Sequence, residues 1–398
     1  MAAGVIVAAA AFLLSKNATT FFQHEARISS AQLAASLGMT RIAADLQRAS
    51  FMSSPNIQRN GVGRCGSTAV FPVGLGSLAG IYIEENGSAI AWPGQLTQSA
   101  DNGLTPDRLI IGGSFSTTEQ FPVQFLESSG VGGQSVYLQT DTGAMARVRD
   151  AQTKGGDSIL TIFAAGRILR VLDPTGRQMY GVIAGTTEVG GNVIVQLEAG
   201  TPLQEKEIAN DCGWGGLGVG MLANPVSRIR YDVRSMVGDP VYGALVNPPV
   251  TELTAEQKAA TGDTGRTELV RTELDAFDVA LSTELVAEYT VDLKFGLTLA
   301  TPGITPTLTR FPIPMASAIY ANAGDVIAPA STPERIRAVQ VRLSTRTRLA
   351  DRSTALPAGP DGRLSRFRID PAMPSPRFAR MRTLYADISL PNQAGISW

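Results

Sequence analysis

Few residues of this chain are of the types that acid–base or metal chemistry requires. There is one histidine, His24, and there are two cysteines, Cys65 and Cys212. A Ser-His-Asp triad would have to recruit His24, and a metal site built on several histidines cannot form. Neither cysteine belongs to a C-x-x-C pair, so a zinc site or a redox motif has no support. The sequence therefore predicts no catalytic residue, no metal site and no cofactor, and hence no enzyme.

The two cysteines leave two interpretations open. Their wide separation in the sequence suits one long-range disulfide bond in an oxidising compartment. The alternative is a pair of buried free thiols.

Carboxylates are plentiful, but most of them flank turns such as TDTG, DPTG and PDGR. Glycosidase-like chemistry would need Asp275, Asp278 and Glu288 to converge in one cleft, and nothing in the sequence brings them together. A G-x-G-x-x-G pattern at 213–218 lacks the preceding apolar strand and the following helix that dinucleotide binding requires. The three carboxylates leave one alternative function open: a signal-anchored extracellular hydrolase or a carbohydrate-binding β domain.

Positive charge is concentrated near the C-terminus. From Glu334 to Asp387 there are twelve Arg and five Asp or Glu, which gives about +7 there and about −8 in the remainder of a chain of net charge −1. Arginines alternate along AVQVRLSTRTR (338–348), as they would on the solvent-facing side of a sheet. Because aromatic residues for base stacking are sparse there, we expect a solvated face or subunit contacts, and we do not expect nucleic acid as a partner.

The first secondary-structure element that the sequence predicts is an N-terminal helix. Residues 2–14 are uninterrupted by charge, but a helix needs roughly 20 apolar residues to cross a bilayer, and no basic residue precedes them. Apolar residues then recur at helical spacing until Pro55. The sequence predicts one long helix over 1–53, with 1–20 as a membrane or filament part and 21–53 as an amphipathic part. Its packing seam consists of Phe21, Ile28, Ala31, Ala35, Met39, Ile42, Leu46 and Ala49.

Residues 54–398 are predicted to be β-rich, in keeping with 41 Gly and 23 Pro in the chain. Asn86-Gly87 indicates a two-residue hairpin turn within 81–92. Residues 249–266 and 300–333 are predicted to be inserted loops. The strands after 158 are expected to form one sheet with those near 226–234, 267–298 and 338–347. Strands are predicted at 107–113, 121–128, 135–141, 158–164, 166–185, 192–199, 227–234, 266–276, 287–299, 338–347 and 378–390.

The order of several stretches resembles a known family. An apolar and then amphipathic N-terminal helix that ends in DLQRASF (45–51), followed by a cysteine and strands, is similar to type IV pilin-like proteins. Within them it most resembles the PilW-type minor pilins, relatives of the J-type minor pseudopilin of type II secretion. The resemblance spans nearly the whole chain apart from 249–266 and 300–333. It rests also on GRILRVLDPTGR, the NDC at Cys212, SRIRYDV, LVRTEL, ELVAEYTVDLKFGL, RAVQVRLSTRTR and RTLYADISLPN.

This resemblance implies an α+β fold in which a long N-terminal helix packs on an antiparallel sheet with β-rich insertions. It implies a structural minor pilin, anchored in the inner membrane by the helix, with residues 54–398 in the periplasm and later at the pilus tip. The implied partners are other minor pilins, the major pilin, a tip adhesin and the inner-membrane assembly platform. It also implies a Cys65–Cys212 disulfide bond that joins the loop after the helix to the glycine-rich loop.

One departure from the family pattern concerns the N-terminus. The basic leader, the glycine cleavage position and the phenylalanine with a glutamate five residues in are not found in this sequence. We therefore expect translation from an internal Met, with ten to fifteen helix residues missing. The peptidase site and the assembly glutamate cannot be placed on any residue of this chain.

Overall fold

The computed structural model describes residues 2–59, 71–128, 133–201, 203–206, 213–246, 263, 265–301, 306–324, 331–350, 353–369 and 377–394. In the first helix the side chains of residues 2–11, 13, 14, 17, 20 and 24 lie outside this description. Cys65 and Cys212 also lie outside it, so the expected disulfide bond stays a prediction.

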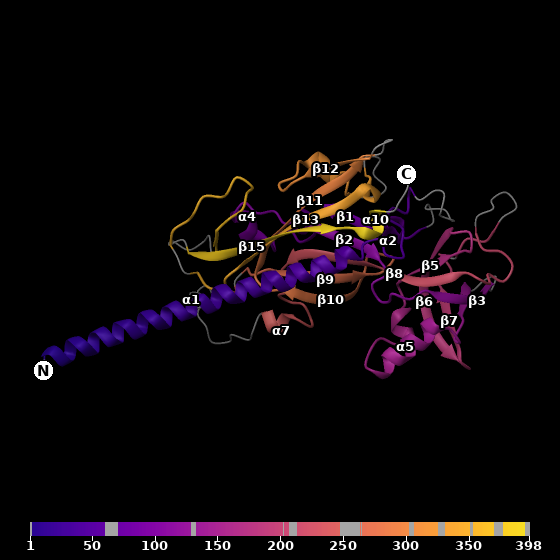
Figure 1. Ribbon diagram of the computed structural model, residues 1–398, viewed down its shortest axis with the longest axis horizontal. Helices are drawn as coiled ribbons and strands as arrows, with labels where there is room; N and C mark the ends of the chain where they lie inside the picture. Colours follow the sequence, from indigo (N-terminus) through magenta and orange to yellow (C-terminus); the bar gives the residue numbers. More distant parts are fainter. Residues whose placement is uncertain are drawn as a thin grey trace.

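Helix α1 (Ala2–Gln47) is the longest element and extends away from the rest of the molecule (Figure 1). Its 46 residues span about 69 Å at 1.5 Å per residue. We call residues 2–26 the projecting segment, because every described side chain there is exposed, and residues 27–47 the docking segment. The helix ends before the predicted residue 53, because Ser50 and Met52 adopt positive φ angles of 60° and 50°.

Within the described residues, ten strands form one antiparallel sheet in which β8 is shared by two lobes. Residues 222–223 of β8 pair with β3 on one edge and residues 222–226 pair with β5 on the other, whereas residues 227–234 pair with β2 and β9. The strands are β1 (Ile81–Glu84), β2 (Arg108–Gly113), β3 (Phe121–Ser128), β4 (Gln134–Leu138), β5 (Ile168–Leu172), β6 (Gln178–Val189), β7 (Asn192–Leu197), β8 (Leu222–Arg234), β9 (Glu268–Leu274) and β10 (Ala280–Ala287).

The first half of β8 closes a small barrel. The order β8-β3-β4-β7-β6-β5 returns to β8, and this barrel lobe lies at the end of the molecule opposite the N-terminus (Figure 1). Helices α5 (Gly143–Thr153) and α6 (Ile159–Ile162) contribute Met145, Val148 and Ile162 to the apolar core of this lobe. Within the described residues, each strand of this ring therefore pairs with a neighbour on both sides.

A second, five-stranded antiparallel sheet has the order β12-β11-β13-β15-β14. Its strands are β11 (Thr290–Thr301), β12 (Thr307–Phe311), β13 (Ile336–Arg346), β14 (Arg366–Arg368) and β15 (Phe378–Ser389). Together with α1, β1, β2, β9, β10 and the second half of β8 this sheet forms the other lobe, which we call the helix lobe. The remaining short helices are α2 (Val73–Gly76), α3 (Gly87–Ala91), α4 (Thr97–Asp101), α7 (Gly243–Val246), α9 (Ser317–Tyr320), α10 (Pro391–Ala394) and the 3₁₀ helix η2 (Pro333–Arg335).

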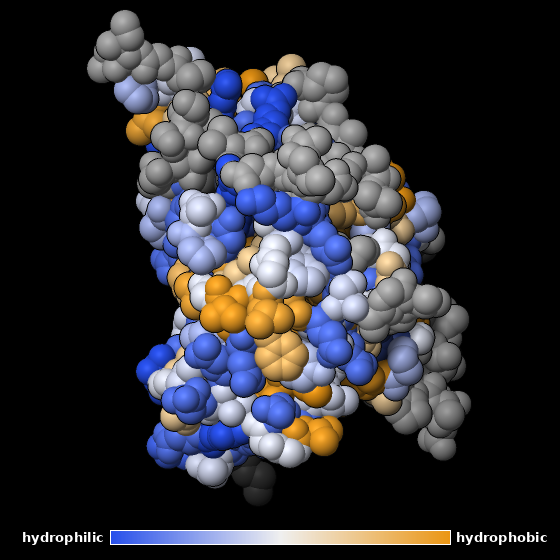
Figure 2. Space-filling model, turned by 90° about the vertical axis from the view of Figure 1, so that its right-hand side faces the viewer, coloured by the Kyte–Doolittle hydropathy of each residue, from blue (hydrophilic) through white to orange (hydrophobic). Residues whose placement is uncertain are grey.

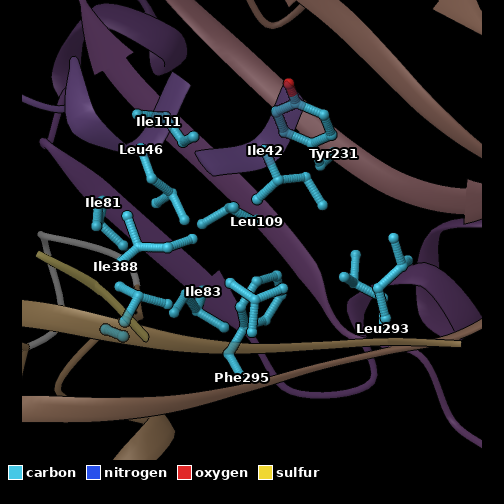
Figure 3. Packing of buried hydrophobic residues seen from close by; sticks show 14 of the residues in the cluster. Ile42, Leu46, Ile81, Ile83, Leu109, Ile111, Tyr231, Leu293, Phe295 and Ile388 are labelled. Atoms are coloured by element: carbon cyan, nitrogen blue, oxygen red, sulfur yellow. The ribbon is translucent and has the colours of Figure 1, made fainter. Parts of the chain in front are cut away.

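The main core lies where the docking segment meets both sheets. Figure 3 shows Ile42 and Leu46 of α1 facing Leu109 of β2, with Phe295 of β11 and Ile388 of β15 on the other side. All five side chains are buried. The two sheets thus cover one helix from two directions, and the fold is α+β, as predicted.

Three predictions about elements are wrong. Residues 81–92 do not form a hairpin: β1 pairs with β2, and Asn86, at φ 54°, precedes helix α3. Residues 158–164 form α6 instead of a strand, because the Ser158 side chain accepts a hydrogen bond from Thr161 N at 3.1 Å and so caps the helix. The expected loop 300–333 contains β12 and α9.

The expected single sheet is also wrong. Strands β8 and β9 belong to the ten-stranded sheet, whereas β11 and β13 belong to the five-stranded one. Both sheets place apolar side chains in the core around α1, so the helix is covered by two sets of strands instead of one. Residues 249–262 and 264 of the other expected loop lie outside the described residues.

Candidate functional site

The packing seam of α1 is the candidate functional feature that the sequence predicts for this chain. The structure divides the seam: Ile28 is half-buried, Phe21 is 60% exposed, and the others are buried, namely Ala31, Ala35, Met39, Ile42, Leu46 and Ala49. The expectation that the seam docks on the protein's own sheet from Phe21 onward is therefore wrong at that residue. The ring of Phe21 contacts the ring of Phe22, at a centroid distance of 6.0 Å.

Gly38 lets the helix backbone approach both sheets closely. A Cβ atom placed on Gly38 would lie 2.9 Å from Leu343 Cδ2 of β13 and 3.2 Å from Leu269 Cδ2 of β9. Glycine costs roughly 1 kcal/mol of helix propensity relative to alanine. The close packing explains why the docking segment tolerates that cost.

A buried ionic contact fixes the end of the docking segment. Asp45 accepts a hydrogen bond from the Tyr231 hydroxyl at 2.6 Å and one from Arg271 Nε at 2.7 Å. Burial, together with the neighbouring Asp45 carboxylate, raises the pKa of Tyr231 above its ordinary value of 10.0. Asp45 belongs to the stretch 45–51, and the sequence predicted no role for it. Its position between Ile42 and Leu46 on the buried face was the signal that a paired charge had to be present.

A second ion pair lies at the exposed edge of the same contact. Arg41 Nη2 is 3.0 Å from Glu284 Oε2 on β10, and Arg271 Nη1 is 3.7 Å from the same oxygen. The Arg41 and Glu284 side chains are 42% and 46% exposed, so solvent screens the pair. Further along α1, the Thr345 hydroxyl donates to Ala31 O at 2.8 Å. The docking segment is therefore held by apolar packing and by polar contacts to β8, β9, β10 and β13.

Another buried charge joins the two sheets. Asp107 lies 2.7 Å from Lys294 Nζ of β11 and accepts a hydrogen bond from the Tyr320 hydroxyl at 2.7 Å. It also accepts one from Asn86 N at 3.0 Å. Burial raises the pKa of Asp107, and Lys294 opposes that rise. The contact that Asp107 makes with Asn86 is the reason why residues 86–87 do not form the expected hairpin turn.

The expected solvated arginine face is wrong for the two central arginines of β13. Arg342 and Arg346 are only 4% and 1% exposed. Arg342 Nε is 2.9 Å from Asp292 Oδ2, and the Arg346 guanidinium lies 5.7 Å from the ring centroid of Phe367. Burial lowers the pKa of Arg346 to about 10. Residues 353–369 cover this side of the sheet, since Arg342 also donates to Asp361 O at 2.6 Å.

The carboxylates considered for glycosidase-like chemistry do not converge. Asp275 accepts hydrogen bonds from Phe277 N and Val279 N at 2.7 and 2.8 Å, which closes a turn. Asp278 lies in the same turn and pairs with Arg228. Glu288 follows the other end of β10 and is 3.5 Å from Arg266. Within the described residues, no three His, Cys, Asp or Glu side chains are grouped to hold a metal ion.

The remaining sequence features are placed as follows. The glycine pattern at 213–218 forms an irregular loop that leads into strand β8 rather than a helix. His24 lies in the projecting segment, and its side chain is outside the described residues. No helix in the described part of the chain combines the length and apolar character that crossing a membrane requires.

Comparison with known proteins gives little. No family model matches the chain, and no curated protein matches it. Among solved structures, a type IV-like pilin from Thermus thermophilus is 11% identical, with a TM-score of 0.18 over 64% of this chain and 100% of that chain. A TM-score this low carries no argument about fold or function.

Proposed function

We propose that this protein is a structural subunit of a type IV pilus, a minor pilin of the PilW type. The observation that supports the proposal best is the division of α1. One segment is clamped between two sheets, and the other presents apolar side chains to solvent, with Phe12 and Phe22 each 69% exposed. Burying an exposed Phe against a neighbour contributes roughly 1.5–3 kcal/mol, so a helix with several such residues favours association.

The projecting segment would pack first in the lipid of the inner membrane and then among the helices of a filament. At 1.5 Å per residue its 25 residues reach about 38 Å from the body of the protein. In this proposal the docking segment holds the globular part at a fixed angle to the filament. The partners would be other minor pilins, the major pilin and the assembly platform in the inner membrane.

The barrel lobe supports a role at the pilus tip. It lies at the far end from the N-terminus, and Figure 2, which faces that end, shows apolar side chains gathered on its surface. Leu217 and Val219, in the glycine-rich loop before β8, are 66% and 62% exposed. We propose that this end carries the contacts to an adhesin, with the domain in the periplasm before assembly and outside the cell afterwards.

A pair of matched substitutions tests the proposal. Phe21→Asp places a charge on the projecting segment, and Val189→Asp places one on the barrel lobe, where Val189 is 64% exposed. Phe21→Asp should abolish co-purification with other minor pilins and reduce piliation, whereas Val189→Asp should leave both unchanged. Thermal melting should be the same for the two variants and the parent protein.

Deletion of the gene separates the proposal from its alternatives. Loss of surface pili or of pilus-dependent motility supports a pilus subunit. Full piliation with loss of type II secretion would instead assign the chain to the secretion pseudopilus. Full piliation with loss of a hydrolytic activity would overturn the structural role.

A further inference from the structure

A pocket lined by arginines lies between α1 and the C-terminal strands. It has a volume of about 540 Å³ and is lined by Gln32 of α1, by residues 363–365 before β14 and by residues 380–384 of β15. This volume is in the range of sites for small ligands. The pocket is separate from the apolar seam, because Gln32 is an exposed residue of the helix.

The charge of the pocket is unbalanced. Three of its lining residues are arginines, Arg363, Arg380 and Arg382, and its described lining contains no carboxylate. Arg363 is exposed and Arg382 is half-buried, and both residues line the pocket.

Other arginines of the same sheet show what the usual arrangement is. Arg342 is paired with Asp292 at 2.9 Å, and Arg310 of β12 is paired with Asp387 at 2.9 Å. Within the described residues, neither Arg363 nor Arg382 has an ion pair of this kind. Arg363 and Arg382 thus bring two positive charges to the pocket for which the described residues provide no ion pair.

The position of Arg382 follows from the strand register. Arg382 is opposite Thr345 of β13, whose hydroxyl bonds to Ala31 O of α1. Arg382 therefore lies where the helix crosses β15, and the two elements run alongside each other in Figure 1. The helix forms one wall of the pocket, and the segment before β14 forms the other.

We propose that this pocket binds a phosphate group. A guanidinium donates two parallel hydrogen bonds that match the oxygens of a phosphate, and arginine is the preferred residue for such recognition. Arg363 and Arg382 are the principal ligands, and the Ser365 hydroxyl and the Gln32 amide add neutral donors at the edge.

The geometry favours a soluble phosphate compound over a lipid headgroup as its source. Gln32 lies 18 residues after Leu14, where the apolar run ends, which is about 27 Å along the helix. If α1 is anchored in a membrane as proposed above, the pocket lies well beyond the headgroup layer. The phosphate site itself does not depend on that anchoring.

The test is calorimetric titration of the full chain with inorganic pyrophosphate. Arg363→Gln and Arg382→Gln should each weaken binding about tenfold, the effect of losing one charge-assisted hydrogen bond. Arg310→Gln is the matched control: it removes one positive charge from an exposed arginine of the same sheet, and it should change the affinity less than about twofold. Arg363 is exposed, so its variant remains folded even if Arg382→Gln is not.

The outcomes separate the sources. If phosphatidylglycerol vesicles bind, if Arg363→Gln weakens that binding, and if pyrophosphate does not bind, the phosphate site is supported. The proposal that the phosphate comes from a soluble compound is then overturned. Absence of binding to both probes would overturn the site, as would equal weakening in all three variants. Binding of a thymidine oligonucleotide without pyrophosphate would overturn it in favour of an extended nucleic-acid surface. These measurements need no pilus, so their failure is distinct from failure of the proposed function.

Discussion

The two segments of α1 belong to one uninterrupted helix with one apolar stripe, but their surroundings differ. In the docking segment Ile42 and Leu46 are fully buried between two sheets, whereas in the projecting segment Phe21 and Phe22 are 60% and 69% exposed. The apolar stripe therefore indicates which residues of the helix are packed, but it does not indicate what they pack against. In one segment the partner is the protein's own strands, and in the other it would be supplied by another molecule.

The largest effect should come from removing the charge that fixes the docking segment. Asp45→Ala would leave the Arg271 side chain, 12% exposed, without its nearest carboxylate. Breaking such a buried pair costs about 3–5 kcal/mol. Denaturant unfolding should show this loss in the free energy of unfolding, and Asp45→Asn, which keeps an acceptor for Tyr231, should lose less. A loss below about 1 kcal/mol for Asp45→Ala would show that the pair does not hold the helix.

The comparison itself is tested by truncating one apolar residue in each segment. Leu46→Ala leaves a cavity in the main core and should cost about 2–5 kcal/mol. Phe22→Ala removes more atoms but no buried contact with a strand, so the stability of the isolated protein should change by less than about 0.5 kcal/mol. Equal losses in the two variants would mean that the projecting segment folds back onto the body in solution.

The sequence predicted the local features of the fold well. The existence of strand β13 and the DPTG turn between β5 and β6 are both confirmed, the turn by the Asp173 N to Arg177 O hydrogen bond at 2.9 Å. Each of these features depends on residues that are neighbours in the chain. The end of α1 was misplaced by six residues, because the two positive φ angles that end it belong to Ser50 and Met52, residues that rarely adopt them.

What the sequence could not predict depends on residues far apart. Asn86-Gly87 fails as a hairpin turn because Asp107, 21 residues away, accepts a hydrogen bond from Asn86. Arg342 is buried because Asp292, 50 residues away, neutralises it. No local pattern indicates that β8 pairs with different strands along its two halves. The arginine pocket was missed for the same reason: alternation predicted a solvated face on β13, whereas the arginines that line the pocket lie on β15 and before β14.

Alkaline pH should weaken the docking segment by a smaller amount. The pKa of Tyr231 is raised in the folded state, so the folded protein holds this proton more tightly than the unfolded chain, whose tyrosine has a pKa of 10.0. Its contribution is complete below pH 10 and is lost as the pH rises above that value. At pH 11 the loss for one such tyrosine is about 1.4 kcal/mol.

Tyr231→Phe isolates that contribution. The variant should be less stable than the parent protein at pH 8, because Asp45 loses a hydrogen bond. The difference between the two proteins should then shrink by about 1.4 kcal/mol between pH 8 and pH 11. Unfolding curves measured at both pH values give the two differences. Parallel pH profiles would show that Tyr231 does not titrate with unfolding.

The smallest effect is expected at the exposed edge of the docking segment. Arg41 and Glu284 are 3.0 Å apart but both about half exposed, so their coupling should be about 0.2–1 kcal/mol and should decrease at high salt. A double-mutant cycle with Arg41→Ala and Glu284→Ala measures it, and the same cycle with Asp45 and Arg271 provides the buried comparison. Similar coupling energies in the two cycles would contradict the view that burial, rather than the number of ion pairs, determines how firmly the strands hold this half of the helix.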